Sequence, residues 1–147
     1  MDKLLRKACV TIMVILATGC GYLCSGTWED SPKNWGRAFQ STKPPEVEVV
    51  HSKYWRSAHF TYEFEYFFHI RSNDDLKEKF FAQNELVKRT DNLEVIKRSF
   101  FGGVPIWFIP KPIDKYDVWT YKNEPRGNFH LFVDKETGDL FITDNQV

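Results

Sequence analysis

The clearest pattern in the chain is a strict alternation of side chains over residues 58–70. Aromatic or aliphatic residues occupy the even positions from Phe60 to Ile70, whereas most of the odd positions between them are polar. A period of two is typical of a strand with one buried face and one solvated face. The pattern predicts a long strand whose odd positions, including Glu63 and Glu65, face solvent or a partner.

The residues before this strand predict its hairpin partner. Residues 47–50, with the sequence VEVV, favour a strand because valine is common in strands. The following segment 52–57, SKYWRS, is expected to be a loop or irregular edge between the two strands. Its large side chains make it a candidate surface for binding.

Two other segments have helical spacing. The Ser31-Pro32 pair supplies an N-cap residue followed by proline at the first helical position, which predicts a short helix to about residue 40. Within it, Trp35 and Phe39 are four residues apart and share the face that is expected to dock onto the domain.

A longer helix is predicted over about 73–88, where Ser72 and Asp75 form a start that resembles a capping box. Residues 91–101 have no decisive period. They fit a third helix that is stopped by the two glycines at 102 and 103, or they fit a strand.

The rest of the chain is expected to be extended. Residues 104–112 are apolar but contain three prolines, which exclude a helix interior or a central strand and predict a connector packed over the core. Residues 116–144 predict a three-strand antiparallel meander with turns at Gly127 and Gly138. Together these elements predict one α+β domain over residues 31–147, with a mainly antiparallel sheet and two or three short helices.

Composition narrows the class further. Of the 147 residues, 42% are hydrophobic, and 13 Phe, 6 Tyr and 5 Trp supply enough apolar surface for a folded core, which excludes a disordered chain. Lys and Arg total 20, as do Asp and Glu, so no basic excess favours binding to nucleic acid.

Residues 1–19 have the three parts of an export signal: a basic start with Lys3, Arg6 and Lys7, an apolar stretch, and an end of small residues. The apolar stretch is roughly a dozen residues long, whereas a helix needs about 20 to span a bilayer. We therefore expect this segment to be a cleaved signal peptide rather than a lasting membrane span.

The end of this leader, Ala17-Thr18-Gly19-Cys20, resembles the lipobox of bacterial lipoproteins. The resemblance implies cleavage between Gly19 and Cys20, with a diacylglycerol thioether and an acyl chain such as palmitate added to Cys20. Several acyl chains anchor a protein stably, since each buried CH₂ contributes about 0.8 kcal/mol. Residues 20–30 would then be a lipidated tether. A conventional secreted protein and an uncleaved anchor are the alternatives.

The residue after the cysteine bears on the membrane. In diderm lipoproteins an Asp there commonly directs retention in the inner membrane, and Gly21 occupies the position here. The resemblance therefore implies an outer-membrane anchor that faces the periplasm, if the source is diderm. Cys24 has no disulfide partner in the chain once Cys9 has left with the leader and Cys20 carries lipid.

The C-terminal hairpin carries a second resemblance. Residues 133–140, VDKETGDL, are similar to the Val-Asp-x-x-Thr-Gly turn of PepSY domains, which are small extracytoplasmic domains with an antiparallel sheet beside helices. The match is confined to this turn. The same pattern also arises locally, where side chains such as Asp134 and Thr137 bond the amides of a turn.

No catalytic or metal-binding arrangement stands out in the sequence. The four histidines lie in separate strands or strand ends, and no two have the spacing of metal ligands, so no metal and no other cofactor is expected. Glu63 and Glu65 share one strand face, where paired carboxylates can do acid–base work. The ordinary explanation of two glutamates on one strand face is that this face is exposed to solvent.

Four large aromatic residues lie at positions predicted to be in the tether, in a loop or on the polar face of a strand, outside the expected core: Trp28, Tyr54, Trp55 and Phe67. Aromatic residues with a neighbouring arginine dominate many protein interfaces. The candidate binding residues are Tyr54, Trp55, Arg56, Glu63 and Glu65. The expected function is a noncatalytic module that binds an envelope protein, of accessory, inhibitor or immunity type. A lipoprotein that binds cell-wall glycan or a small ligand is the main alternative, and a hydrolase is a further one.

Overall fold

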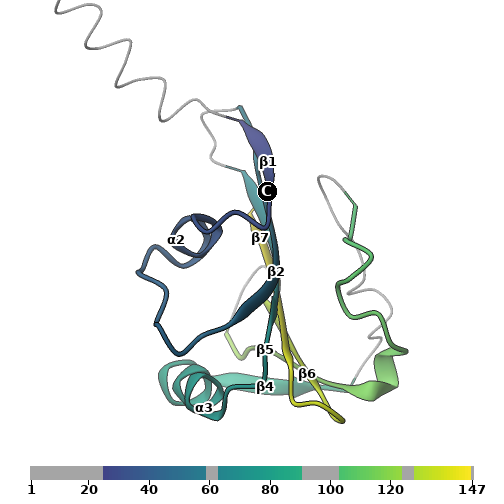
Figure 1. Cartoon of the computed structure of the whole chain (residues 1–147). Helices are drawn as coiled ribbons and strands as arrows, with labels where there is room; N and C mark the ends of the chain where they lie inside the picture. Colours follow the sequence, from purple (N-terminus) through teal and green to yellow (C-terminus); the bar gives the residue numbers. More distant parts are fainter. Residues whose placement is uncertain (1–24, 59–62, 91–102, 124–127, 147) are drawn as a thin grey trace, which may run out of the picture.

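The computed structural model describes residues 25–58, 63–90, 103–123 and 128–146. Within them, seven strands form one sheet, and two α-helices pack against one face of it (Figure 1). The strands are β1 (Gly26–Glu29), β2 (Val49–Arg56), β3 (Phe64–Ile70), β4 (Leu86–Arg89), β5 (Tyr116–Tyr121), β6 (His130–Asp134) and β7 (Leu140–Gln146). The helices are α2 (Asn34–Phe39) and α3 (Asp74–Gln83), and a 3₁₀ turn spans Ile113–Lys115. Neither α-helix is long and apolar enough to cross a membrane.

The strand order is β1-β2-β3-β7-β6-β5-β4, and all neighbouring strands are antiparallel. The predicted class, α+β with a mainly antiparallel sheet, is confirmed. The predicted meander is met in part: β5, β6 and β7 are neighbours, but β7 also pairs with β3 and so joins them to the N-terminal strands. The described ranges hold two α-helices, the lower of the two numbers predicted.

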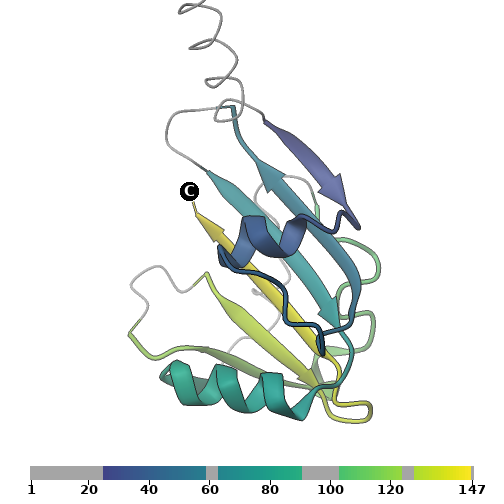
Figure 2. The same ribbon diagram turned by 60° about the vertical axis from the view of Figure 1, so that its left-hand side comes forward.

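The sheet is buried on both faces, which gives the domain three layers (Figures 1 and 2). Helices α2 and α3 cover the helix-side core, which includes Trp35, Tyr54, Tyr66, Phe68, Ile70, Leu131 and Ile142. The segment 103–115 covers the second core, which includes Phe67, Phe108, Phe132 and Phe141. Because side chains alternate along a strand, Phe67 and Phe68 of β3 enter different cores.

Residues 104–112 pack over the core as predicted, but they turn at residues 106–109 instead of running extended. Their position corrects the expected solvation of β3. Phe108 and Ile109 of this segment are buried against the second core. On the odd face of β3, Glu65 and Phe67 are only 3% and 2% exposed. Alternation along a strand shows which face is more apolar, but it cannot show that a distant segment will cover the other face.

The loop predicted over 52–57 is wrong, because β2 continues through Arg56. Tyr54 lies opposite Tyr66 of β3 and is 2% exposed in the helix-side core. Large aromatic residues suit a pleated strand, and neither glycine nor proline interrupts this segment. The first residues of the predicted long strand, 59–62, lie outside the described residues.

Residues 26–29, expected in the tether, form the edge strand β1 against β2. The Trp28 ring lies 6.1 Å from the ring of Tyr54, and the guanidinium of Arg37 lies 4.3 Å from the centre of the Trp28 ring. So short a strand has no visible period, and its pairing with β2 gives it its conformation. The described sheet therefore begins six residues after Cys20.

Helix α2 forms where it was predicted, although its cap differs. The N-cap is Lys33 rather than Ser31, whose carbonyl accepts the amide of Asn34 at 2.9 Å. Trp35 and Phe39 share one face, with ring centroids 4.5 Å apart, and both rings contact the helix-side core. This confirms the predicted docking of the helix.

Helix α3 is shorter than predicted. Asn73 is its N-cap, and the Asn73 side chain accepts the amide of Leu76 at 2.8 Å. The helix ends where the Asn84 side chain donates to the carbonyl of Phe80 at 3.0 Å. Residues 86–89 then form β4 and pair with β5, so backbone pairing outweighs the helical preference of these residues. The undecided segment 91–101 lies outside the described residues.

The turn between β6 and β7 follows from its own side chains. Asp134 accepts the amides of Glu136 and Thr137 at 2.8 and 3.2 Å, and the Thr137 hydroxyl accepts the amide of Asp139 at 3.2 Å. Gly138 has a φ of 75°, in the left-handed region. These bonds account for the Asp-x-x-Thr-Gly pattern locally, so the PepSY resemblance stays a prediction.

Replacing Gly138 with alanine is expected to lower the free energy of unfolding by about 1–2 kcal/mol. Alanine is strained at this φ, and its Cβ would lie 2.7 Å from the Ser72 hydroxyl oxygen. Urea unfolding measures the loss. The control is Gly36→Ala at an exposed position of α2, where a Cβ meets only the Ser41 carbonyl at 3.9 Å and should not destabilise. Equal losses in both variants would contradict the explanation.

Candidate binding sites

The structure separates the five residues that were predicted to bind a partner. Tyr54 and Glu65 are interior, on opposite faces of the sheet, so neither offers a surface. The other three come together where β2 ends and β3 approaches, at an open depression of about 460 Å³. The depression is lined by Ser25, Gly26, Trp55, Arg56, Ser57, Ala58 and Glu63. For Trp55, Arg56 and Glu63 a role in binding stays a prediction.

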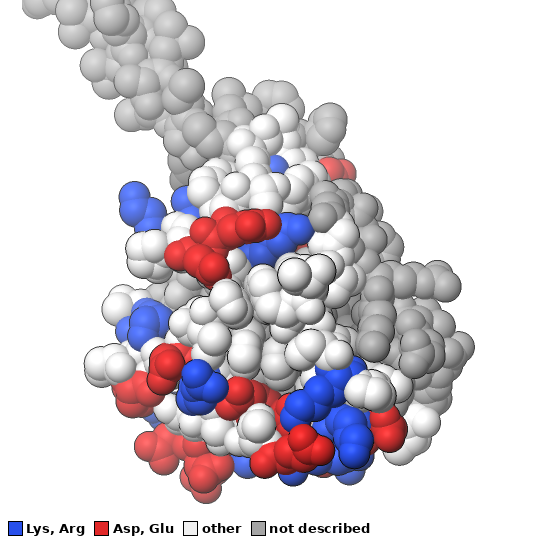
Figure 3. Space-filling model, turned by 45° about the vertical axis from the view of Figure 1, so that its right-hand side comes forward, with Lys and Arg blue, Asp and Glu red and all other residues white. Residues whose placement is uncertain are grey.

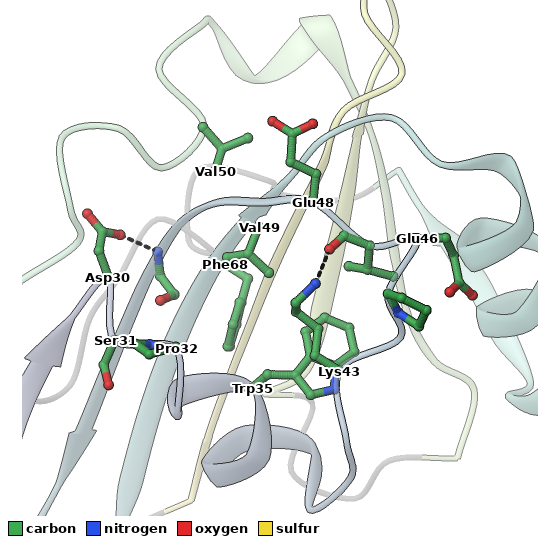
Figure 4. Close-up of a pocket in the computed structure, with 13 residues that line it drawn as sticks. Asp30, Ser31, Pro32, Trp35, Lys43, Glu46, Glu48, Val49, Val50 and Phe68 are labelled. Carbon is green, nitrogen blue, oxygen red and sulfur yellow. Dashed lines mark hydrogen bonds between the residues drawn. The ribbon is translucent and has the colours of Figure 1, made fainter.

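A larger pocket, of about 740 Å³, opens beside α2 on the helix side of the sheet (Figure 4). It lies between the residues that follow β1, helix α2, and the segment that leads into β2. Trp35, Val47 and Phe68 belong to the helix-side core and form the apolar floor of the pocket.

One wall of this pocket is a turn that the sequence builds locally. The amide of Val47 donates to the carbonyl of Pro44 at 3.1 Å. The amine of Lys43 donates to the carbonyls of Pro44 and Val47, the second of which is drawn in Figure 4. Two consecutive prolines restrict the backbone here. The charge of Lys43 is therefore directed at backbone oxygens of the wall itself.

The rim of the pocket is acidic. Its carboxylates belong to Asp30, Glu46 and Glu48, and each is at least 42% exposed. Glu46 lies 3.3 Å from the amine of Lys79, and Glu48 lies 3.8 Å from the guanidinium of Arg71. A backbone hydrogen bond at Glu46, and then Lys79, lower the pKa of its carboxyl despite some desolvation. Glu46 is therefore ionised at neutral pH.

The opposite face of the sheet carries two histidine–aspartate pairs. His51 of β2 and His69 of β3 are directly opposite, with ring centroids 6.3 Å apart. His51 Nδ1 lies 3.2 Å from Asp30, and His69 Nε2 lies 3.0 Å from Asp139. Sequence reasoning missed this juxtaposition. With residues 52–57 as the loop of a hairpin, His51 would lie opposite the start of the next strand and not opposite His69. Among the described residues, no three His, Cys, Asp or Glu side chains form a group that could hold a metal ion.

Both of these aspartates also bind backbone. Asp30 accepts the amide of Ser52, and Asp139 accepts the amide of Ser72, each at 2.8 Å. Asp139 thereby ties the start of the α3 region to the end of the β6–β7 turn. The pairs consequently have a structural role that accounts for them without any ligand.

Several polar side chains are buried in the sheet: Glu65, Thr120, His130, Thr143 and Asn145. Burial lowers the pKa of His130, against the effect of its hydrogen bond to the Asn128 carbonyl, so the ring is neutral at pH 7. Within the described ranges, Asn145 Oδ1 is a buried oxygen without a hydrogen-bond donor. None of these side chains lines either of the two pockets described above.

In comparisons with known proteins, no family model, no curated protein and no solved structure matches the chain. Function is therefore inferred from the lipobox residues and from the geometry of the pockets. Sequence reasoning missed the larger pocket because residues 47–50 were interpreted only as a strand. In the structure Glu46 and Glu48 alternate with Val47 and Val49, so the carboxylates lie at the rim and the valines toward the floor.

Proposed function

We propose that this chain is a lipid-anchored lipoprotein of the bacterial cell envelope that acts as a noncatalytic module and holds a protein partner. The anchor would be lipid on Cys20, and Gly21 favours the outer membrane. The binding site would be the pocket beside α2, which would take a basic side chain of the partner. The lipobox supports the anchor, and the chemistry of the pocket supports the partner class.

The combination of an apolar floor with an acidic rim carries the proposal. Pro32 and Pro45 are exposed and Val49 is half-buried, so they offer apolar surface above the buried floor, whereas Glu46 and Glu48 stand in water beside it. Arg and Lys side chains have this same division, an alkyl stem that packs on apolar surface and a charged head that stays in water. Lys43, the cation among the lining residues, is already engaged by backbone carbonyls. Complementary charge at such a rim favours specificity and rapid association.

This pocket fits a glycan ligand less well than a basic side chain. A sugar ring needs an open aromatic face on which to stack, and Trp35 is 6% exposed with its ring packed 4.5 Å from that of Phe39. The aromatic floor is therefore closed to a flat sugar ring, whereas exposed Pro45 and half-buried Val49 can still pack against a narrow alkyl chain. This favours a protein partner over cell-wall glycan.

A photocross-linking experiment tests the site in intact envelopes. The exposed rim residue Pro45 is replaced by p-benzoylphenylalanine in the full chain, and cross-linked products are identified by mass spectrometry. We expect a discrete protein adduct, and Glu48→Lys to reduce its yield about tenfold, equivalent to about 1.4 kcal/mol of binding free energy. The physical reason is repulsion between the new amine and the partner's cation.

The control is Glu78→Lys, the same charge reversal on the exposed face of α3, which should leave the adduct unchanged. An adduct that is insensitive to Glu48→Lys would refute the pocket as the site. An adduct with glycan in place of protein would refute the partner class.

A further inference from the structure

We propose that the end of the sheet where β1 begins docks against a lipid surface with anionic headgroups, through Trp55 and Arg56; this inference rests on the proposed lipidation of Cys20. The register places four strand ends in a row. Gly26 of β1 lies opposite Arg56 of β2, Arg56 lies opposite Phe64 of β3, and Phe64 lies opposite Gln146 of β7. This row is defined as the β1 end of the sheet.

The length of chain before the sheet limits how far the β1 end can stand from the membrane. Five residues separate Cys20 from Gly26. An extended chain spans at most about 3.6 Å per residue, so Gly26 lies no more than about 22 Å from an anchored Cys20. The opposite end of β7, a strand of seven residues, lies roughly 20 Å farther along the sheet. The short chain between Cys20 and Gly26 therefore keeps the β1 end closer to the lipid than the other end of the sheet.

The chemistry of the β1 end suits the interface of a bilayer. Its depression has seven lining residues, of which two, Arg56 and Glu63, are charged. Tryptophan is enriched at the level of lipid headgroups, where its apolar ring and polar N–H are both accommodated. Half-buried Trp55 lies beside Arg56, whose guanidinium can bind a headgroup phosphate with two hydrogen bonds.

The opposite end of the molecule has a contrasting surface. Figure 3 shows acidic and basic side chains most densely at the lower end of the view, where α3 and the β6–β7 turn lie, with a smaller charged group higher up. Ion pairs there include those of Lys111 with Asp134 and Glu136, both at 2.8 Å. Such charges favour water over a lipid interface. The distribution of charge and the short tether therefore both favour the β1 end as the end that faces the membrane.

Quenching by brominated lipid tests the docking with the full lipidated chain. The protein is reconstituted into vesicles of phosphatidylethanolamine, phosphatidylglycerol and brominated phosphatidylcholine, and tryptophan emission is measured. The ring of Trp28 also lies at the β1 end, next to Gly26, so the measurement is made in a Trp28→Phe background. We expect partial quenching there, which Trp55→Phe should reduce by at least half, because Trp55 is then the tryptophan that lines the depression. Trp119→Phe, on β5, is the matched control and should keep the quenching. Arg56→Gln should weaken it only when phosphatidylglycerol is present.

A spin label provides a reading that does not depend on replacing Trp55. In a Cys24→Ser background, nitroxides are placed at exposed Ala58→Cys, in the depression, and at Lys135→Cys, in the β6–β7 turn. The label at 58 should be several-fold more accessible to membrane-dissolved oxygen than the label at 135. Equal accessibility, or quenching unaffected by Trp55→Phe, would overturn the docking.

Flotation of the same vesicles separates this inference from the proposed anchor. The wild-type chain should float with the vesicles, and Cys20→Ser should not. Flotation without quenching of Trp55 would overturn the docking and leave the anchor intact. Failure of the wild-type chain to float would overturn the anchor, and the docking with it.

Discussion

Replacing Phe108 with alanine is expected to lower the free energy of unfolding by about 3–5 kcal/mol, the usual cost of removing a buried phenylalanine ring. Its ring centroid lies 5.0 Å from that of Phe67, 5.7 Å from that of Phe132 and 5.9 Å from that of Phe141. The substitution would leave a cavity where three strands meet the segment 103–115. Urea unfolding followed by tryptophan fluorescence measures the loss.

The same segment offers a matched control two residues away. Ile106 is 96% exposed, so Ile106→Ala removes apolar atoms that are already in water and should change stability by no more than about 0.5 kcal/mol. Similar effects of the two substitutions would mean that 103–115 does not form a packed layer. The comparison therefore tests the second face of the sheet, which the sequence pattern did not predict to be buried.

Asp134→Ala is expected to lower the free energy of unfolding by about 2–3 kcal/mol, the range for hydrogen bonds to a charged group. The Asp134 side chain is 4% exposed and accepts the amides of Glu136 and Thr137. It also accepts a bond from the amine of Lys111 at 2.8 Å. Alanine removes all three contacts, and thermal or urea unfolding measures the result.

Asp134 also makes stability depend on pH. Burial alone would raise the pKa of its carboxyl, but Lys111 and the two turn amides outweigh burial and hold the pKa below its ordinary value of 3.8. Because the pKa is lower in the folded state, the stabilisation is complete above about pH 4 and is lost as the pH falls through the folded pKa. As the pH falls below about 4, wild type should lose more stability than Asp134→Asn.

Urea unfolding at a series of pH values checks this difference. Asp74→Asn, at an exposed carboxylate of α3, should keep the wild-type dependence on pH. If Asp134→Asn kept it as well, another group would be responsible. Glu136 and Glu46, whose pKa values are also lowered, would be the next carboxylates to replace.

Features that depend on neighbouring residues were predictable from the sequence. The β6–β7 turn forms because Asp134, Thr137 and Gly138 act within a few residues of one another. The shared face of Trp35 and Phe39 follows from helical spacing alone. In both cases the interacting groups are close in the chain, so local pattern and local structure agree.

Features that depend on distant segments were not predictable in this way. Phe67 on the odd face of β3 is buried because Phe108 of a distant segment packs against it, and β4 is a strand because β5 lies beside it. The candidate site shows the same limit. Tyr54 was assigned to a surface loop because nothing in 52–57 shows that β1 will pair with this segment and extend it as a strand.

The two edges of the sheet bear on the solubility of the protein at high local concentration. The edge strands β1 and β4 each have four residues, and β4 carries Lys88 and Arg89. Short, charged edges are poor templates for a strand from another molecule. The proposed lipid anchor would confine copies of the protein to two dimensions and so would raise the frequency of their encounters. Brief edges of this kind would limit sheet-to-sheet aggregation under that crowding.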